Sequence, residues 1–201
     1  MIKRFLQKTT AFIMLILCAF LSFSCSNGAQ SKDDLKKLVI GVDYYEPFVY
    51  LSPDGELSGF DIDLATVVCR YIGYEPQFVY IDWSDKKSYL SNGVIDCIWS
   101  CFTFTGREFD YAWTLPYMKS KQVIAVGKDS NIETISDLKD KIVGVQSTTK
   151  ADDILSGKVK LNNIVIPKIK RLVCFSQANY LYASLSSGLV DALAAHRIVL
   201  E

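Results

Sequence analysis

Short apolar runs alternate with helical patterns along most of this chain, and the alternation occurs twice. One series fills residues 37–99, and a second begins after Pro116-Tyr117. Because crossover helices join neighbouring parallel strands, each series predicts an α/β sheet. The chain is therefore expected to form two α/β lobes, with ligands bound beyond the carboxyl ends of the strands. The predicted strands cover 37–42, 77–81, 95–99, 122–126, 142–146, 171–174 and 190–193, and the predicted helices cover 61–72, 85–90, 135–138, 151–155 and 177–185.

The start of the helix predicted at 61–72 carries a distinctive pattern. Gly59 allows a turn, Asp61 is a suitable N-cap, and Asp63 lies in the first turn, where the helix dipole favours a carboxylate. Phe60 is then held at the mouth of the helix, where it serves either as a core residue or as the wall of a cleft. Asp61 and Asp63 are assigned to capping and solvent, not to binding.

The N-terminus has the pattern of an export signal. Residues 1–8 contain three basic residues and no acidic one, and 9–23 form an apolar run too short to span a membrane comfortably. Cys25 follows a small residue and resembles the lipidated cysteine of a bacterial lipobox. We therefore expect a signal peptide at 1–24 and a lipidated N-terminus and tether at 25–36, which would anchor the protein at the membrane surface. The alternative is plain secretion, with Cys25 incidental or part of a transmembrane anchor.

Charge argues against a nucleic-acid-binding protein. The chain has 22 basic and 22 acidic residues. Without the three basic residues of the signal peptide, 19 face 22, so the net charge of the mature chain is about −3. A nucleic-acid groove needs a basic excess, so no nucleic-acid partner is expected. The remaining length, roughly 175 residues, suffices for one core or two small ones.

The remaining cysteines do not predict a metal site. No CxxC pair occurs among them, and His196 is the one histidine of the sequence, so structural zinc is not expected. The helical and strand positions of two of them favour free core thiols. The cysteines concerned are Cys69, Cys97, Cys101 and Cys174.

A series of short motifs, in a fixed order, covers the chain after the tether. They lie at 38–43, 45–48, 59–65, 93–96, 105–108, 116–117, 137–139, 143–146 and 188–192. In this order they resemble the bacterial extracellular solute-binding proteins of family 3. The resemblance implies a two-lobe periplasmic-binding-protein-like fold of type II. It also implies an exported protein, periplasmic or extracellular, that delivers polar amino acids or relatives to an ABC transporter permease without enzymatic activity, cofactor or metal.

The resemblance also assigns binding roles in the first lobe. Arg107 corresponds to the arginine that holds the ligand's α-carboxylate, a role that suits the two parallel bonds of a guanidinium. A surface ion pair with Glu108 or Asp110 is the alternative. Tyr45 and Phe60 correspond to two aromatic walls around the ligand side chain. Ser100, Cys101 and Thr103 correspond to the segment that contacts the ligand, with Cys101 in place of a small polar residue.

In the second lobe, Ser147 and Thr148 are expected to open a helix whose free N–H groups bind the same carboxylate, although simple capping is an alternative. His196 stands where many members carry the aspartate that binds the α-amino group. Because a neutral imidazole offers no countercharge, Asp43 is the candidate substitute. A purely structural His196 is equally compatible with the pattern.

The resemblance divides the chain into lobe 1 at 37–117, a hinge at 118–120 and lobe 2 at 121–201. Members usually continue for several tens of residues and cross back to the first lobe, so the chain is expected to be truncated at its C-terminus, without the return crossover. Two other functions stay open: a dehydratase-like enzyme on the same fold, and a ligand-sensing surface lipoprotein.

Overall fold

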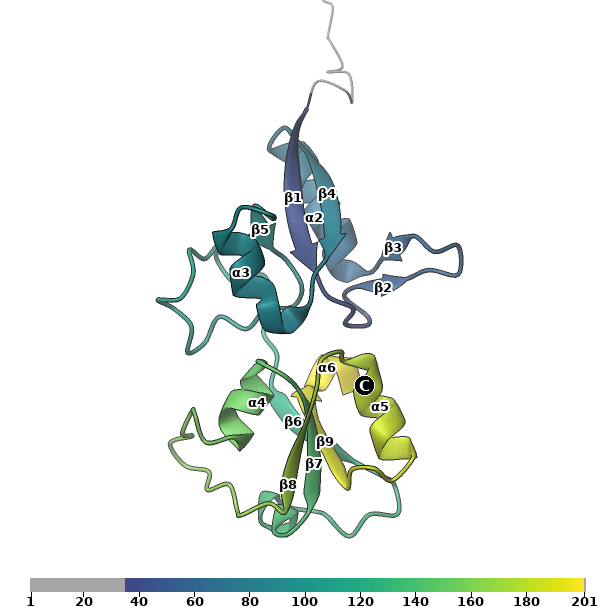
Figure 1. The fold of residues 1–201 in the computed structure, drawn as a ribbon, viewed down its shortest axis with the longest axis vertical. Helices are drawn as coiled ribbons and strands as arrows, with labels where there is room; N and C mark the ends of the chain where they lie inside the picture. Colours follow the sequence, from purple (N-terminus) through teal and green to yellow (C-terminus); the bar gives the residue numbers. More distant parts are fainter. Residues whose placement is uncertain (1–34, 201) are drawn as a thin grey trace, which may run out of the picture. The chain divides into compact units, whose positions relative to one another are not determined.

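The computed structural model describes residues 35–200, in which strand pairing builds two main β-sheets and a short hairpin (Figure 1). The predicted signal peptide, the predicted lipidation site Cys25 and most of the predicted tether lie outside the described residues. Within 35–200, no helix combines the length and the apolar character needed to cross a bilayer.

The first sheet has the strand order β4-β1-β5, and all of its pairs are parallel. Its core combines apolar residues of β1 with one face of α2, including the fully buried Ile40, Val42 and Ala65. We call this sheet with its helices the first lobe. Its elements are β1 (Lys36–Val42), β2 (Tyr50–Leu51), β3 (Leu57–Ser58), α2 (Phe60–Tyr71), β4 (Tyr74–Tyr80), the 3-10 helix η2 (Trp83–Asp85), α3 (Lys86–Ser91) and β5 (Cys97–Ile98).

The second sheet has the order β6-β9-β7-β8, with β6 antiparallel to β9 and the other pairs parallel. Buried valines and alanines of β7 and β9 form its core with Leu138. We call this sheet with its helices the second lobe. Its elements are β6 (Gln122–Val126), the 3-10 helix η3 (Ile135–Leu138), β7 (Ile142–Gln146), α4 (Lys150–Leu155), β8 (Arg171–Phe175), α5 (Asn179–Ser186), β9 (Ala192–His196) and α6 (Arg197–Leu200).

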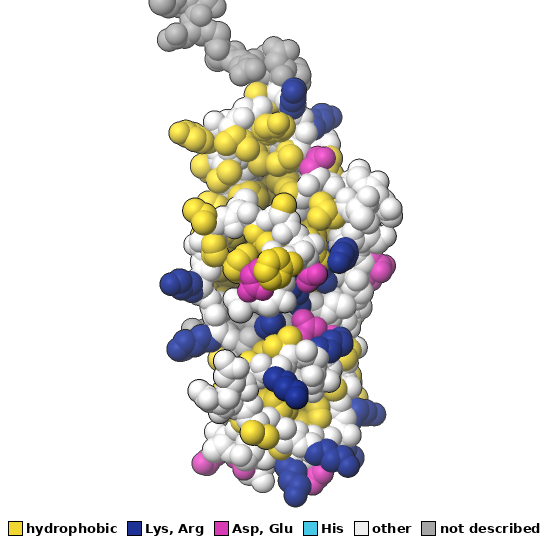
Figure 2. Space-filling model, turned by 90° about the vertical axis from the view of Figure 1, so that its left-hand side faces the viewer, with side chains coloured by type: hydrophobic (Ala, Val, Ile, Leu, Met, Phe, Trp, Pro, Cys, Tyr) yellow, Lys and Arg dark blue, Asp and Glu magenta, His cyan; other side chains and the backbone are white. Residues whose placement is uncertain are grey.

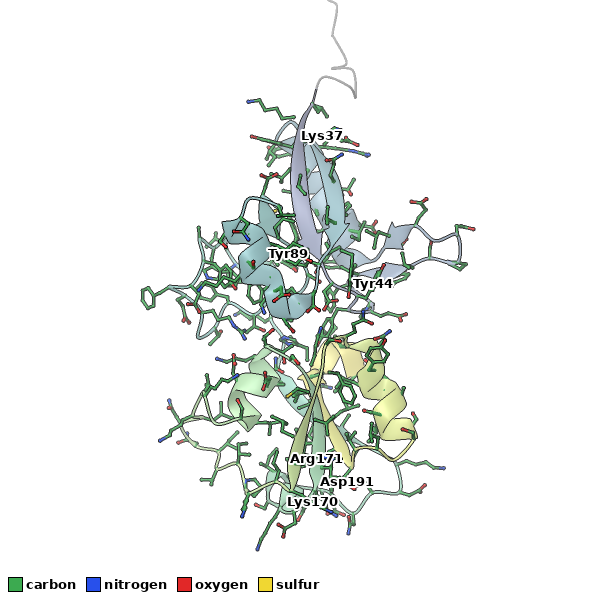
Figure 3. The ribbon with its side chains drawn as sticks, viewed as in Figure 1. Lys37, Tyr44, Tyr89, Lys170, Arg171 and Asp191 are labelled. Atoms are coloured by element: carbon green, nitrogen blue, oxygen red, sulfur yellow. The ribbon has the colours of Figure 1, made fainter. Side chains whose placement is uncertain are left out.

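The carboxyl ends of the parallel strands in the two lobes meet. Tyr44, just after β1, lies at this junction, whereas Lys37 and Arg171 lie at the opposite ends of their strands (Figure 3). The junction is bridged by a 2.5 Å hydrogen bond from Gln146 Nε2, at the end of β7, to Asp43 Oδ2, which follows β1. The arrangement is the one predicted for ligand binding on α/β sheets.

The predicted element types are confirmed, but several strands differ in their bounds, and β4 begins at Tyr74, not at the predicted Gln77. β6 and β7 have the predicted bounds. β5 is reduced to Cys97–Ile98, although Trp99 N–H still donates to the Gly41 carbonyl. β9 runs on to His196 because its antiparallel pairing with β6 extends to Gln122. The hairpin β2-β3 was not predicted.

The N-cap assigned to Asp61 is wrong. Gly59 is the N-cap of α2, without a side-chain capping bond, and Asp61 is 1% exposed inside the first turn. Its two oxygens accept hydrogen bonds from the Cys101 backbone N–H and the Tyr117 hydroxyl, both at 2.7 Å. These two tertiary hydrogen bonds hold the Asp61 carboxylate, so it does not cap the helix. Asp63 is exposed, as predicted.

Glycine is required at position 59 for two reasons: its positive φ and the close approach of the Phe48 backbone. Its φ is +123°, and a Cβ at this position would lie 2.3 Å from the Phe48 carbonyl oxygen. Phe48 is buried and its carbonyl accepts from Asp61 N–H, so it cannot retreat without breaking the start of α2. The expectation that Gly59 turns the chain before the helix is confirmed.

The distribution of surface charge and the state of the cysteines can be compared with what the composition predicts. On the face seen in Figure 2, basic and acidic side chains are interspersed, and no broad basic field appears on that face. The four cysteines of the described part of the chain are free. Cys69 on α2 is buried and Cys97 on β5 is half-buried, whereas Cys174 is exposed and is not a core thiol.

Candidate functional site

A cavity lies where the two lobes meet and encloses about 360 Å³ of empty space, part of it continuous with solvent. Residues of both lobes line it: Asp43, Tyr45, Trp83, Ser100, Cys101, Phe102, Thr103 and Arg107 from the segments before β6, and Gln146, Thr148, Thr149, Lys150 and His196 from β7, α4 and β9.

Arg107 reaches across this cavity. One of its terminal nitrogens, Nη2, lies 2.7 Å from Asp153 Oδ2 and 3.1 Å from the Thr148 carbonyl oxygen. The other, Nη1, makes only a 3.5 Å contact with the Thr103 carbonyl oxygen. The side chain is 10% exposed, so the ion pair is largely shielded from water. The ion-pair partner of Arg107 is thus Asp153 of the second lobe. The alternative, a surface ion pair with Glu108 or Asp110, is not formed among the described residues.

Asp43 is the most deeply buried ionisable group of the cavity. It is 2% exposed, and Gln146 occupies Oδ2. Oδ1 has no hydrogen-bond partner among residues 35–200. Burial raises the pKa of Asp43 to about 6, although the Gln146 hydrogen bond opposes the change. A buried carboxylate oxygen without a partner is unfavourable, so this atom favours a ligand that donates a hydrogen bond.

His196 ends β9 inside the cavity, and contacts within the protein engage its ring. Nε2 lies 2.9 Å from Thr103 Oγ1, and the Gln122 amide nitrogen lies 3.0 to 3.1 Å from both ring nitrogens. Burial, with a smaller effect of the Arg107 charge, lowers the pKa of His196 from 6.5. The ring is therefore neutral at pH 7 and bridges the lobes through Thr103.

The segment after β5 is held in an unusual conformation. Ser100 Oγ donates to the Asp43 carbonyl at 3.0 Å and accepts from Asp43 N–H at 3.2 Å. Cys101 has a φ of +47°, and its N–H is fixed by Asp61. Burial raises the pKa of the Cys101 thiol to about 12, so the thiol is neutral. Ser100, Cys101 and Thr103 all line the cavity, and the ligand contact that the resemblance implies for them stays a prediction.

The predicted anion site at Ser147 and Thr148 is not formed by free helix N–H groups. α4 begins at Lys150 with Thr149 as N-cap. The Thr148 N–H is already taken by Asp152 Oδ2 at 2.8 Å. The Ser147 N–H donates to the Phe175 carbonyl, and Ser147 does not line the cavity. Of the two predicted residues, only Thr148 lines the cavity.

Phe60 also lies elsewhere than predicted. It is 49% exposed, packs against Phe48 and Tyr117, and does not line the cavity. Its assignment as a cleft wall is corrected, because the turn at the start of α2 directs it toward the segment before β6. Three other aromatic residues line the cavity: Tyr45, Trp83 and Phe102.

Sequence reasoning missed several polar residues at this junction, including Gln146, Lys86 and Lys150. Gln146 ends a predicted strand, and the rule that ligands bind beyond carboxyl strand ends could have identified it. Lys86 is 5% exposed and donates to the Trp83 carbonyl and to Thr148 Oγ1 at 2.8 and 2.7 Å. Burial, then the nearby Arg107 charge, lowers the pKa of Lys86 to about 8. No local pattern marks either lysine.

The described residues do not form a metal centre. Within 35–200, no group of three or more His, Cys, Asp and Glu residues is placed to hold a metal ion. The cavity offers one buried carboxylate, a neutral imidazole and the two cationic side chains of Arg107 and Lys150, which suits a small organic ligand with charged groups.

Comparison with known proteins places the chain among binding proteins. It is 30% identical to the arginine-binding extracellular protein ArtP of Bacillus subtilis over 67% of this chain and 55% of that protein. It is 32% identical to the histidine-binding periplasmic protein of Salmonella typhimurium over 90% of this chain and 68% of that protein. The chain thus spans about half to two thirds of the length of these relatives.

Solved structures of two-lobe amino-acid-binding proteins of type II share the fold. Holo ArgBP from T. maritima matches with a TM-score of 0.71 and 30% identity, covering 82% of this chain and 70% of that one. AncCDT-1, described as an ancestral amino acid-binding protein and a precursor of cyclohexadienyl dehydratase, matches with a TM-score of 0.72 and 29% identity, covering 81% and 71%. The family profile of the bacterial extracellular solute-binding proteins, family 3, matches residues 38–194. With this match and the two-lobe fold, the chain belongs to the bacterial extracellular solute-binding proteins of family 3.

Proposed function

We propose that this protein captures a polar amino acid or a related small carboxylate between its two lobes and delivers it to an ABC transporter permease. The observation that carries the proposal is the cavity at the facing strand ends, which is lined by charged and aromatic residues of both lobes. The named relatives bind arginine or histidine, which supports an amino acid as the ligand class. We propose binding without turnover.

The free hydrogen-bonding positions of the cavity suit an amino acid. Arg107 would hold a ligand carboxylate through Nη1, whose one hydrogen bond within residues 35–200 is long. Asp43 Oδ1 would accept from the α-ammonium group, a role that neutral His196 cannot fill with a countercharge. Tyr45, Trp83 and Phe102 would cover the ligand side chain.

Closure of the lobes is the motion that such a site requires. The polar contacts between the lobes come from residues of the cavity or beside it, as in Asp43 to Gln146, Thr103 to His196 and Arg107 to Asp153. A ligand would exchange or add to these contacts, so its binding and closure are linked. We place the hinge at 118–120, between lobe 1 at 37–117 and lobe 2 at 121–201.

The test is calorimetry after a thermal-shift screen of the twenty amino acids and small carboxylates. A ligand at 100 times its Kd should stabilise the protein by about 2.7 kcal/mol. Arg107→Ala should weaken binding at least tenfold, whereas the control Arg70→Ala, on the exposed end of α2, should not. Unchanged affinity of Arg107→Ala would remove Arg107 from the site, and a screen without any ligand would refute the function.

Export and anchoring belong to the same proposal. We propose that the signal peptide at 1–24 directs export and that Cys25 is lipidated, which would hold the protein at the periplasmic or extracellular face of the membrane, near the permease. Cys25→Ser should move the protein from the membrane fraction to the soluble fraction. Equal membrane association of both forms would contradict lipidation at Cys25.

A further inference from the structure

Lys150 is a charged residue of the cavity to which neither the sequence analysis nor the proposed function assigns a role. It is the first residue of α4, lines the cavity and is 9% exposed. Among residues 35–200, no hydrogen bond or ion pair engages its ammonium group. An ammonium group that lines a cavity and has no hydrogen bond or ion pair within this part of the chain can bind an anionic group of a ligand.

The backbone of the first lobe leaves room for this ammonium group. Gly106 has a φ of +79°, and a Cβ at that position would lie 2.4 Å from Lys150 Nζ. Lys150 thus reaches across the junction to the residue directly before Arg107. The two cationic side chains belong to different lobes and line one cavity.

The acidic groups around the cavity already have other partners or are placed for another role. Asp153 pairs with Arg107, and Asp152 accepts from Thr148 N–H and lies 3.9 Å from Lys158. Glu108 is exposed and accepts from the Gly106 N–H; that bond, with a smaller effect of Lys150, lowers its pKa. Asp43 offers its free oxygen to a donor. None of these carboxylates forms an ion pair with Lys150 in the described part of the chain.

We propose that Lys150 is a ligand-binding residue that receives a second carboxylate, so that the cleft selects amino acids with an acidic side chain. This inference rests on the proposed function and narrows its ligand class. The ligand's two carboxylates would meet Arg107 and Lys150, and its ammonium group would meet Asp43. Charge balance favours the acid over its amide, because an amide leaves the Lys150 charge uncompensated.

Calorimetry with the full chain tests the inference, with L-glutamate, L-glutamine and L-arginine as ligands. Glutamate and glutamine have nearly the same shape, so their affinity ratio reports the charge alone. We expect glutamate to bind at least tenfold more tightly than glutamine. Lys150→Met should reduce that ratio to below threefold, and Lys150→Arg should restore it. The control Lys158→Met removes a 61%-exposed lysine near α4 and should leave the ratio unchanged.

The outcomes separate two proposals: that the protein binds an amino acid or small carboxylate, and that Lys150 selects acidic side chains. If glutamine or arginine binds as tightly as glutamate, the inference is overturned and the proposed function stands. Equal weakening of glutamate and glutamine by Lys150→Met also overturns it, because a structural role would not change the ratio. If the protein binds no amino acid or small carboxylate at all, the proposed function fails, and the inference fails with it. Circular dichroism of both Lys150 variants shows whether the fold is retained, and Lys150→Arg keeps the test valid where Lys150→Met does not fold.

Discussion

Replacing Asp43 with asparagine should alter how the stability of the protein depends on pH. In the folded protein burial raises the pKa of Asp43 to about 6, whereas the ordinary value is 3.8. Between these two values the folded state binds more protons than the unfolded state, so stability falls as the pH rises through this window. Asparagine does not titrate, and the variant should lack this loss.

The magnitude follows from the difference between the two pKa values. About two pKa units correspond to about 3 kcal/mol, at 1.36 kcal/mol per unit. Asp43 is 2% exposed, so solvent screening reduces this figure little. Asparagine can still accept the hydrogen bond of Gln146, but its amide nitrogen lacks a partner in the place of Oδ1. That cost is the same at every pH and cancels when the two pH profiles are compared.

The assay is urea unfolding of the wild type and Asp43→Asn between pH 4 and pH 8, followed by tryptophan fluorescence. The difference in unfolding free energy, variant minus wild type, should rise by about 3 kcal/mol across this range, with most of the rise between pH 4 and pH 6. Other carboxylates titrate alike in both proteins. Parallel profiles would refute the assignment of an ionising, desolvated carboxyl group to Asp43.

Three further predictions concern other parts of the fold. His196 is the one histidine of the chain, so its NMR titration is unambiguous; the midpoint should lie below 6.5, and neutral His196 should contribute stability above pH 6.5 that is lost as the pH falls below it. A midpoint at or above 6.5 would contradict the burial argument. For the Arg107–Asp153 pair, a double-mutant cycle with alanine should give a coupling energy of about 0.5 to 3 kcal/mol in urea unfolding, and zero coupling would show that the pair is solvated. Gly59→Ala should cost at least ~2 kcal/mol more than Gly55→Ala, since both positions have positive φ but only Gly59 would place its Cβ against a backbone oxygen; equal costs would exclude that clash.

The element types could be predicted because they depend on local pattern. The runs at β6 and β7 are apolar, β-branched and bounded by polar residues, and their bounds were predicted without error. β9 was misplaced toward its N-terminal side because its end is set by pairing with β6, which lies some seventy residues earlier. The 3-10 geometry of η3 and the short hairpin β2-β3 have no clear signal in periodicity.

Sequence could identify only those cavity residues that belong to the motifs of the family. Asp43, Tyr45 and Arg107 were found through the family resemblance, and the structure brings them together. Lys86 and Lys150 are defined by contacts across the junction between the lobes, which no local pattern encodes. Phe60 was misassigned because the sequence gives its place at the start of the helix but not the direction of its ring.

Asp61 shows how a residue remote from the ligand can have the mutational profile of a contact residue. It does not line the cavity, but its carboxylate fixes the backbone of Cys101 and the hydroxyl of Tyr117. A loss-of-binding screen would score substitutions at Asp61 with those at Arg107, although Arg107 is the proposed ligand contact and Asp61 shapes only the loop at Cys101. Structures of variants, not affinities alone, are therefore needed before such a screen is read as a map of the binding site.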